Sequence, residues 1–290
     1  MAIFLPLILI ILMSSLVVGK SPNFFDYDNY DDMLETGSYV LRYQQEPISM
    51  VMMYLSTFLD EGAFGFYLIV WVLYLLSVVY LSLRYYAHIW FTASTFLLFN
   101  PLSIMAFLTP RHFLSLTLIL LAIHLTRIRA LLVLGSSVLA HFVLGVFALF
   151  FVRLQKYSNF ISFLLMFFGV ASFYIFMVEM YPQLMEKGLD QGRGQAIYGL
   201  IFLFIYYLVM FRKSVKFGFY ITSYFFILIL YLINPIAYRF FSLWIIMAFL
   251  YMVSNLKKKD SFLIIRGFTF LSVGLSAFIV MTGMYGYGPQ

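Results

Sequence analysis

The chain has 290 residues, of which 64% are hydrophobic and only 10% are charged, and its mean hydropathy is +0.98. Soluble domains carry roughly 25% charged residues, so this composition excludes a soluble globular protein and predicts an integral membrane protein. The absence of cysteine excludes disulfides, thiolate catalysis and cysteine-ligated metals. The net charge of +6 reports membrane topology rather than an acidic partner, and it does not indicate nucleic-acid binding.

The apolar segments, separated by charged residues, have the pattern of membrane helices rather than of alternating barrel strands. Five basic clusters begin at Arg84, Arg127, Arg153, Arg212 and Lys257. The positive-inside rule assigns all five to the cytoplasmic side, which predicts about eleven crossings with the N-terminus inside and the C-terminus outside. The predicted spans are residues 1–19, 63–83, 87–107, 113–126, 130–141, 142–152, 158–179, 196–211, 217–233, 238–254 and 262–284.

The expected fold class is therefore all-α: a polytopic helical membrane protein forming one integral membrane domain over residues 1–290. Residues 1–19 have the length of a cleaved signal peptide, but they lack a basic start and a clean cleavage site, so they are expected to form a span. Residues 130–152 could form one span. Two short helices that fold back near His141 are favoured because they keep the basic residues 212–216 inside. Each would cover only about 18 Å, less than the ~30 Å hydrocarbon core.

Two outer segments, residues 20–62 and 179–195, are expected to contribute to a functional site. Within the first, residues 47–59 begin with Pro47, which favours a helix start, and are too short to span. They are predicted to form a re-entrant or interfacial helix on the outer side. Glu46 would then lie at a helix N-terminus, where the dipole favours a carboxylate; simple helix capping is the alternative. The acidic residues 26–32 lack the EF-hand glycine and terminal Glu, which favours a solvated acidic face over a calcium site.

Membrane topology does not explain Arg111 and Arg239, which occur in the predicted outer connections "FLTPRHF" and "NPIAYRFF". Each arginine taken alone could extend to lipid headgroups. Two arginines in equivalent positions, each near a proline and an aromatic residue, favour a shared anionic site, because cations near membrane depth usually face a cavity or a partner.

The order of these motifs resembles the EpsG family of bacterial exopolysaccharide proteins, which are related to the Wzy O-antigen polymerases. The resemblance covers most of residues 20–255. It rests on Asp26, Asp28 and Tyr30 in the first outer loop, then on "EPISMVMMYL", "PRHFLSLTLILLAIHL", "LLVLGSSVLAHFVLGVFALFF" and the late "AYRFFSLWIIMAFLY".

The resemblance implies a membrane glycosyltransferase of polysaccharide biosynthesis. It would transfer a growing glycan from undecaprenyl pyrophosphate to a lipid-linked oligosaccharide repeat unit. The expected location is the bacterial cytoplasmic (inner) membrane, with the active site facing the periplasm or the cell exterior. Its partners would be the lipid-linked oligosaccharide, the bilayer, and a chain-length regulator or flippase of the same pathway. No cofactor and no metal are expected, since arginines can bind the pyrophosphate.

The predicted catalytic residues are Glu46, Arg111, Arg239 and His141. The arginines would bind phosphate oxygens with their planar guanidinium groups, and Glu46, or alternatively His141, would accept the proton of the sugar hydroxyl. Acidic and aromatic side chains suit the binding of sugars, and Arg193 suits the binding of phosphate. The predicted substrate-binding residues are Asp28, Tyr30, Tyr43, His112, Arg193 and Tyr238.

Three other functions remain open. A glycan ligase would use nearly the same residues, whereas a lipid-linked oligosaccharide flippase or other transporter should carry charges through both leaflets. A non-catalytic assembly subunit would tolerate replacement of Arg111, Arg239 and Glu46 without loss beyond stability.

Overall fold

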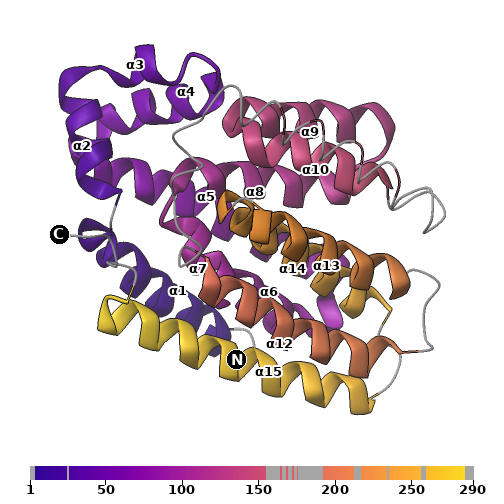
Figure 1. The fold of residues 1–290 in the computed structure, drawn as a ribbon. Helices are drawn as coiled ribbons and strands as arrows, with labels where there is room; N and C mark the ends of the chain where they lie inside the picture. Colours follow the sequence, from indigo (N-terminus) through magenta and orange to yellow (C-terminus); the bar gives the residue numbers. More distant parts are fainter. Residues whose placement is uncertain are drawn as a thin grey trace. The chain divides into compact units, whose positions relative to one another are not determined.

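The computed structural model describes residues 4–24, 26–154, 192–211, 217–233, 235–255 and 259–284, with the single positions 164, 168, 172 and 175. Every regular element in these residues is a helix, so the predicted all-α class is confirmed. Most of the predicted span 158–179 and most of the loop 179–195 lie outside the described residues. The α-helices are α1 (Phe4–Gly19), α2 (Tyr27–Thr36), α3 (Tyr39–Arg42), α4 (Pro47–Ser56), α5 (Gly62–Tyr85), α6 (Trp90–Phe99), α7 (Pro101–Phe107), α8 (Pro110–Ile123), α9 (Arg127–Ala140), α10 (Phe142–Leu154), α12 (Arg193–Met210), α13 (Phe217–Ile233), α14 (Arg239–Ser254) and α15 (Lys259–Thr282) (Figure 1).

Four helical segments in the described part of the chain are long and apolar enough to cross a membrane: Phe4–Asn23, Gly62–Tyr85, Arg193–Met210 and Phe262–Thr282. The pair Ala87–Phe99 and Pro101–Phe107, bent by 48°, makes a fifth if it counts as one span. Large apolar side chains such as Leu76 and Leu271 are exposed on these helices, as expected where lipid rather than water surrounds the protein. These features are those of a helical membrane protein. The eleven crossings and their orientation stay predictions.

The chain divides into two compact units. The first contains Met1–Gly145 and Arg266–Gln290, and the second contains Val146–Ile265. In the second, α14 packs against α12 and α13, and its residues are buried along almost the whole helix.

The core of the first unit is an aromatic cluster that joins α5, α7 and α8. The rings of Trp71 and Phe113 stack with centroids 5.6 Å apart, and Phe107 meets Trp71 edge-on at 4.7 Å. The ring centroids of Tyr74 and Phe113 lie 4.2 Å apart. The Tyr74 hydroxyl donates a hydrogen bond to the Leu97 carbonyl at 2.9 Å. This packing places the beginning of α8, and therefore Arg111, against α5.

Asn100 and Pro101 cause the break between α6 and α7. The Asn100 side chain accepts hydrogen bonds from the backbone N–H groups of Leu102 and Ser103, both at 3.0 Å, and so caps α7. Proline suits the first position of a helix, where no N–H partner is needed. Asparagine followed by proline therefore ends one helix and starts the next at an angle.

Residues 20–61 form a helical insertion with α2, α3 and α4, which lie together in Figure 1. Asp31 attaches α2 to α5 by accepting a hydrogen bond from the Ala63 N–H at 2.8 Å. Gly62 has φ +54°, and a Cβ there would lie 2.3 Å from the Asp31 carboxylate. Asp31 thus stabilises the positive end of the α5 dipole. The acidic residues 26–32 were expected to form a solvated face, and Asp31 among them therefore has a structural role.

The helix predicted at 47–59 is present as α4 and the following 3₁₀ turn Thr57–Leu59. It packs against α5 and α9, while Val51, Tyr54 and Phe58 are exposed. Its depth in the membrane stays a prediction.

The predicted division of 130–152 into two helices agrees with the structure, because α9 ends at Ala140 and α10 begins at Phe142. His141 between them is extended, with φ −154° and ψ 105°. Gly145 makes the turn possible: a Cβ at this position would lie 2.4 Å from backbone atoms of Val138.

Candidate functional site

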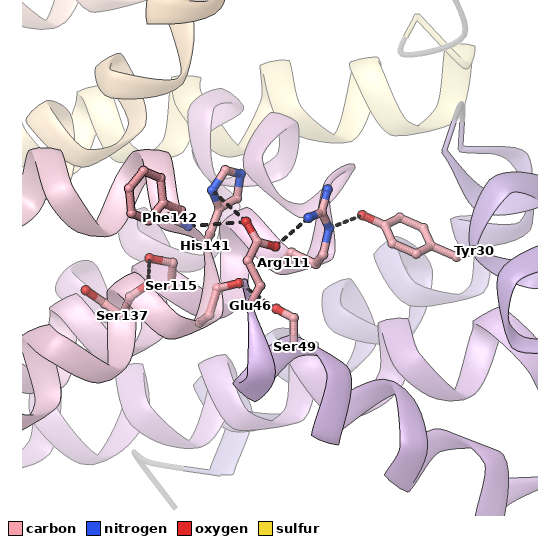
Figure 2. Close-up of polar contacts among 9 residues, drawn as sticks. Tyr30, Glu46, Ser49, Arg111, Ser115, Ser137, His141 and Phe142 are labelled. Atoms are coloured by element: carbon pink, nitrogen blue, oxygen red, sulfur yellow. Dashed lines mark hydrogen bonds and ion pairs between the residues drawn. The ribbon is translucent and has the colours of Figure 1, made fainter. Parts of the chain in front are cut away.

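Residues from four separate segments of the first unit meet in one polar cluster (Figure 2). Tyr30 comes from α2, Glu46 directly precedes α4, Arg111 lies in the first turn of α8, and His141 separates α9 from α10. All four are among the residues that the sequence predicts for a site. They are as far as 111 positions apart in the chain, from 30 to 141.

The Arg111 guanidinium has three partners. Its Nη1 forms an ion pair with Glu46 Oε2, and its Nε donates a hydrogen bond to the Tyr30 hydroxyl at 3.3 Å. Its Cζ lies 3.9 Å from the centre of the Tyr43 ring, which is a cation–π contact. The Arg111 side chain is 22% exposed, against 11% for Glu46, so the guanidinium is the more accessible half of the ion pair.

Glu46 occupies the N-cap position of α4, but its side chain makes no capping hydrogen bond to that helix. Its Oε1 instead accepts a hydrogen bond at 3.2 Å from the N–H of Phe142, the first residue of α10. The carboxylate therefore lies at the positive end of the α10 dipole. Simple capping of α4, the alternative interpretation of Glu46, does not describe its contacts.

Two buried histidines extend the cluster behind Glu46. His141 Nδ1 lies 3.7 Å from Glu46 Oε1, and the rings of His112 and His141 meet edge-to-face with centroids 5.4 Å apart. His112 follows Arg111 in α8 and is almost completely buried. One of its contacts in the structure is with the second histidine, and its predicted substrate contact stays a prediction.

The two tyrosines contribute neutral phenol groups. Burial raises the pKa of Tyr30 to about 12, and burial also raises the pKa of Tyr43. Both groups therefore remain protonated at neutral pH. Tyr30 accepts a hydrogen bond from Arg111 through its oxygen, and Tyr43 offers the negative face of its ring.

Asp28 does not join this cluster by any described contact. It is exposed on α2, whereas Tyr30 and Met33 form the buried side of that helix. A role for Asp28 in binding sugar hydroxyls stays a prediction.

The remaining predicted residues lie in the second unit. Arg193 is the first residue of α12 and is exposed, while Arg239 is the first residue of α14. The two helix starts touch, because a Cβ on Gly192 would lie 2.2 Å from the Cβ of Tyr238. Arg239 Cζ lies 5.8 Å from the centre of the Tyr238 ring. Arg193 thus begins a helix that lies next to the start of α14. That Arg193, Tyr238 and Arg239 share a site with Arg111 stays a prediction.

Chemically, the first cluster combines a carboxylate, a cation and two imidazoles. A carboxylate or an imidazole accepts a proton, and a guanidinium has five N–H donors, of which the described contacts use Nε and Nη1. Among the described residues there is no group of three or more His, Asp or Glu side chains placed to hold a metal ion. The donor set fits binding of an anion and a hydroxyl-bearing molecule.

Ser49 and Ser115 are not among the residues that the sequence predicts for the site. Ser49 Oγ donates to the Ala140 carbonyl at 2.6 Å, and Ser115 Oγ donates to the Ser137 carbonyl at 2.9 Å. The sequence held one signal for each: Ser49 follows Glu46 by three residues and Ser115 follows Arg111 by four, so each serine shares a helix face with a predicted site residue.

Comparison with models of protein families, with curated proteins and with solved structures finds no match for this chain.

Proposed function

We propose that this protein is a membrane glycosyltransferase: a polymerase that moves a growing glycan from undecaprenyl pyrophosphate to a lipid-linked oligosaccharide repeat unit. The observation that carries the proposal is the meeting of Glu46, Arg111 and His141 in one cluster. These residues come from the motifs on which the resemblance to the EpsG family and the Wzy polymerases rests. The apolar helices support a substrate held in a bilayer.

In the proposed reaction, a hydroxyl oxygen of the acceptor sugar attacks the anomeric carbon of the donor glycan. The bond from that carbon to the pyrophosphate oxygen breaks, and lipid pyrophosphate leaves with the bonding electron pair. The hydroxyl proton passes to Glu46, or to His141 beside it. Such a base typically accelerates a reaction by about 10²–10⁴-fold.

The leaving group gains negative charge as its bond breaks, so a fixed cation lowers the barrier. Arg111 is the candidate of the first unit, since its guanidinium is partly exposed and held in place by Tyr43 and Tyr30. Arg239 and Arg193 are the candidates of the second unit, with Tyr238 beside them. We place the reaction at the outer face of the bacterial cytoplasmic membrane, where lipid-linked repeats would be joined.

The test is a polymerisation assay on purified protein in nanodiscs, with a synthetic undecaprenyl-pyrophosphate repeat unit and a chelator. Wild-type protein should give a ladder of glycan lengths on a gel. Glu46→Gln and Arg239→Ala should abolish the ladder while the purified protein stays monodisperse. Arg129→Lys is the matched control, because Arg129 is exposed on α9, and it should polymerise like wild type.

No ladder from wild-type protein, with a substrate that matches the host glycan, would contradict the proposal. Lipid flipping would then be measured on the same nanodisc lipids in liposomes. Full activity of Glu46→Gln and Arg239→Ala would instead exclude both residues from the reaction.

A further inference from the structure

The carboxyl end of α9 needs hydrogen-bond donors from elsewhere. The last four carbonyls of a helix have no intrahelical partner, and burial without a partner is unfavourable. In α9 the Ala140 carbonyl is one of these, while the Ser137 carbonyl is bonded by the backbone N–H of His141, and both residues are fully buried. His141, which follows, is extended and directs the chain out of the helix.

Two serines from other helices donate to these two carbonyls. Ser49 of α4 donates to the Ala140 carbonyl at 2.6 Å, and Ser115 of α8 donates to the Ser137 carbonyl at 2.9 Å. Both serines are fully buried. The Ser137 carbonyl also accepts from the His141 N–H at 3.0 Å, so Ser115 bonds the same oxygen that holds the His141 backbone.

The spacing relates each serine to one member of the ion pair. Ser49 is three residues after Glu46 and Ser115 is four residues after Arg111, and these are the spacings at which helix residues share a face. Glu46 at the N-cap of α4 and Arg111 in the first turn of α8 thus each lie about one helical turn before a serine that bonds the end of α9. The Ser49 bond reaches Ala140, the residue directly before His141.

We infer that Ser49 and Ser115 are positioning residues, which hold His141 beside the Glu46–Arg111 pair by bonding the last turn of α9. The bonds act through the backbone, so neither serine needs to touch a substrate. The consequence for catalysis rests on the proposed function, whereas the placement of the His141 ring does not.

The chain offers a control for each serine. Ser56 is a fully buried serine of α4 whose hydroxyl bonds the Met53 carbonyl of its own helix at 2.7 Å. Thr117 is a buried residue of α8 that bonds the Phe113 carbonyl of its own helix at 2.9 Å. Ser56→Ala and Thr117→Val therefore remove a buried hydroxyl without removing a bond to α9.

The experiment records the imidazole ¹³C and ¹⁵N signals of histidine-labelled protein in nanodiscs, without any glycan. The chain has four histidines, so four single His→Gln variants assign the signals. We expect Ser49→Ala and Ser115→Ala to shift or split the His141 signal while that of the distant His88 stays in place. Ser56→Ala and Thr117→Val should leave His141 as in wild type. Ser49→Thr, which keeps the hydroxyl, should restore the wild-type signal.

An unchanged His141 signal in folded Ser49→Ala and Ser115→Ala would overturn the inference, and so would equal shifts in the two controls. If an alanine variant does not fold, Ser49→Cys and Ser115→Cys replace it, since a thiol has similar size and is a weaker donor. In the polymerisation assay the alanine variants should lose about 10²-fold in rate, the usual effect of a misplaced catalytic group. A wild type without activity would refute the proposed function alone, because the histidine signals are measured without substrate.

Discussion

Groups from two other segments of the chain, α2 and the connection between α3 and α4, hold the Arg111 guanidinium. The Glu46 carboxylate and the Tyr30 hydroxyl lie at its edge, and the Tyr43 ring lies against its face. A planar guanidinium can make edge and face contacts at the same time, and a lysine ammonium cannot. Arginine therefore suits position 111 better than lysine, because its partners contact both the edge and the face of the side chain.

The strength of the ion pair can be tested with a double-mutant cycle. Glu46→Gln or Arg111→Gln alone should each lower the free energy of unfolding by about 3 kcal/mol, because each leaves one buried charge without its partner. The double variant should cost clearly less than the sum of the two. Unfolding is followed by tryptophan fluorescence in nanodiscs. Additive losses would show that the two side chains do not interact.

At the scale of helices, two breaks determine how the first unit is built, and they have different causes. The break at Asn100 is local, since the side chain caps the next helix and proline begins it. The break at His141 depends on other parts of the chain: Glu46 bonds the first N–H of α10, and two serines bond the carbonyls of α9. The second break is thus coupled to the ion pair.

The close contact at the second break predicts the effect of one methyl group. Gly145→Ala would place a Cβ 2.4 Å from the Val138 backbone, which cannot move aside as a side chain can. We expect a loss of about 2–3 kcal/mol in unfolding free energy, typical of overpacking. Gly135→Ala in α9 is the control, because its Cβ would meet nothing within 4 Å.

The control should gain roughly 0.5–1 kcal/mol, since alanine favours a helix over glycine. Denaturant unfolding of both variants in the same detergent gives the comparison. Equal stability of the two variants would show that α9 and α10 do not meet as closely as the structure has them.

At the scale of the whole molecule, the acids are concentrated in one segment. Of the acidic residues in the described part of the chain, all but Asp260 lie between positions 26 and 61. The long apolar helix α5 follows, with Arg84 near its other end. This arrangement predicts that the ends of α5 lie on opposite sides of the membrane, with the basic end inside.

The absence of native cysteine makes this orientation directly measurable. A cysteine at Glu35, exposed on α2, should react with a membrane-impermeant thiol reagent on intact cells. A cysteine at His88, exposed beyond the other end of α5, should react only after permeabilisation. The opposite pattern would reverse the predicted topology and place the Glu46–Arg111 cluster on the cytoplasmic side.

The sequence predicted many of the helix boundaries, because these depend on nearby residues. Pro47 begins α4, and basic residues follow the ends of apolar segments. The division of 130–152 was predicted differently, from the side of the membrane assigned to the basic residues 212–216. The sequence also selected Glu46, Arg111, His141, Tyr30 and Tyr43 as site candidates, and these lie together. The capping of α5 by Asp31 and the serine bonds to α9 were not predicted, since each joins residues at least 22 positions apart.

The sequence by itself determined the membrane class, the helical content and the residue types available for chemistry, because composition and short-range spacing depend on local physical preferences. Only the tertiary structure decided what each charge contacts. It paired Glu46 with Arg111 and with the start of α10 instead of with its own helix. The reason is physical: in a poorly hydrated environment a charged group is stable only beside a partner, and which partner comes within reach depends on how distant helices pack.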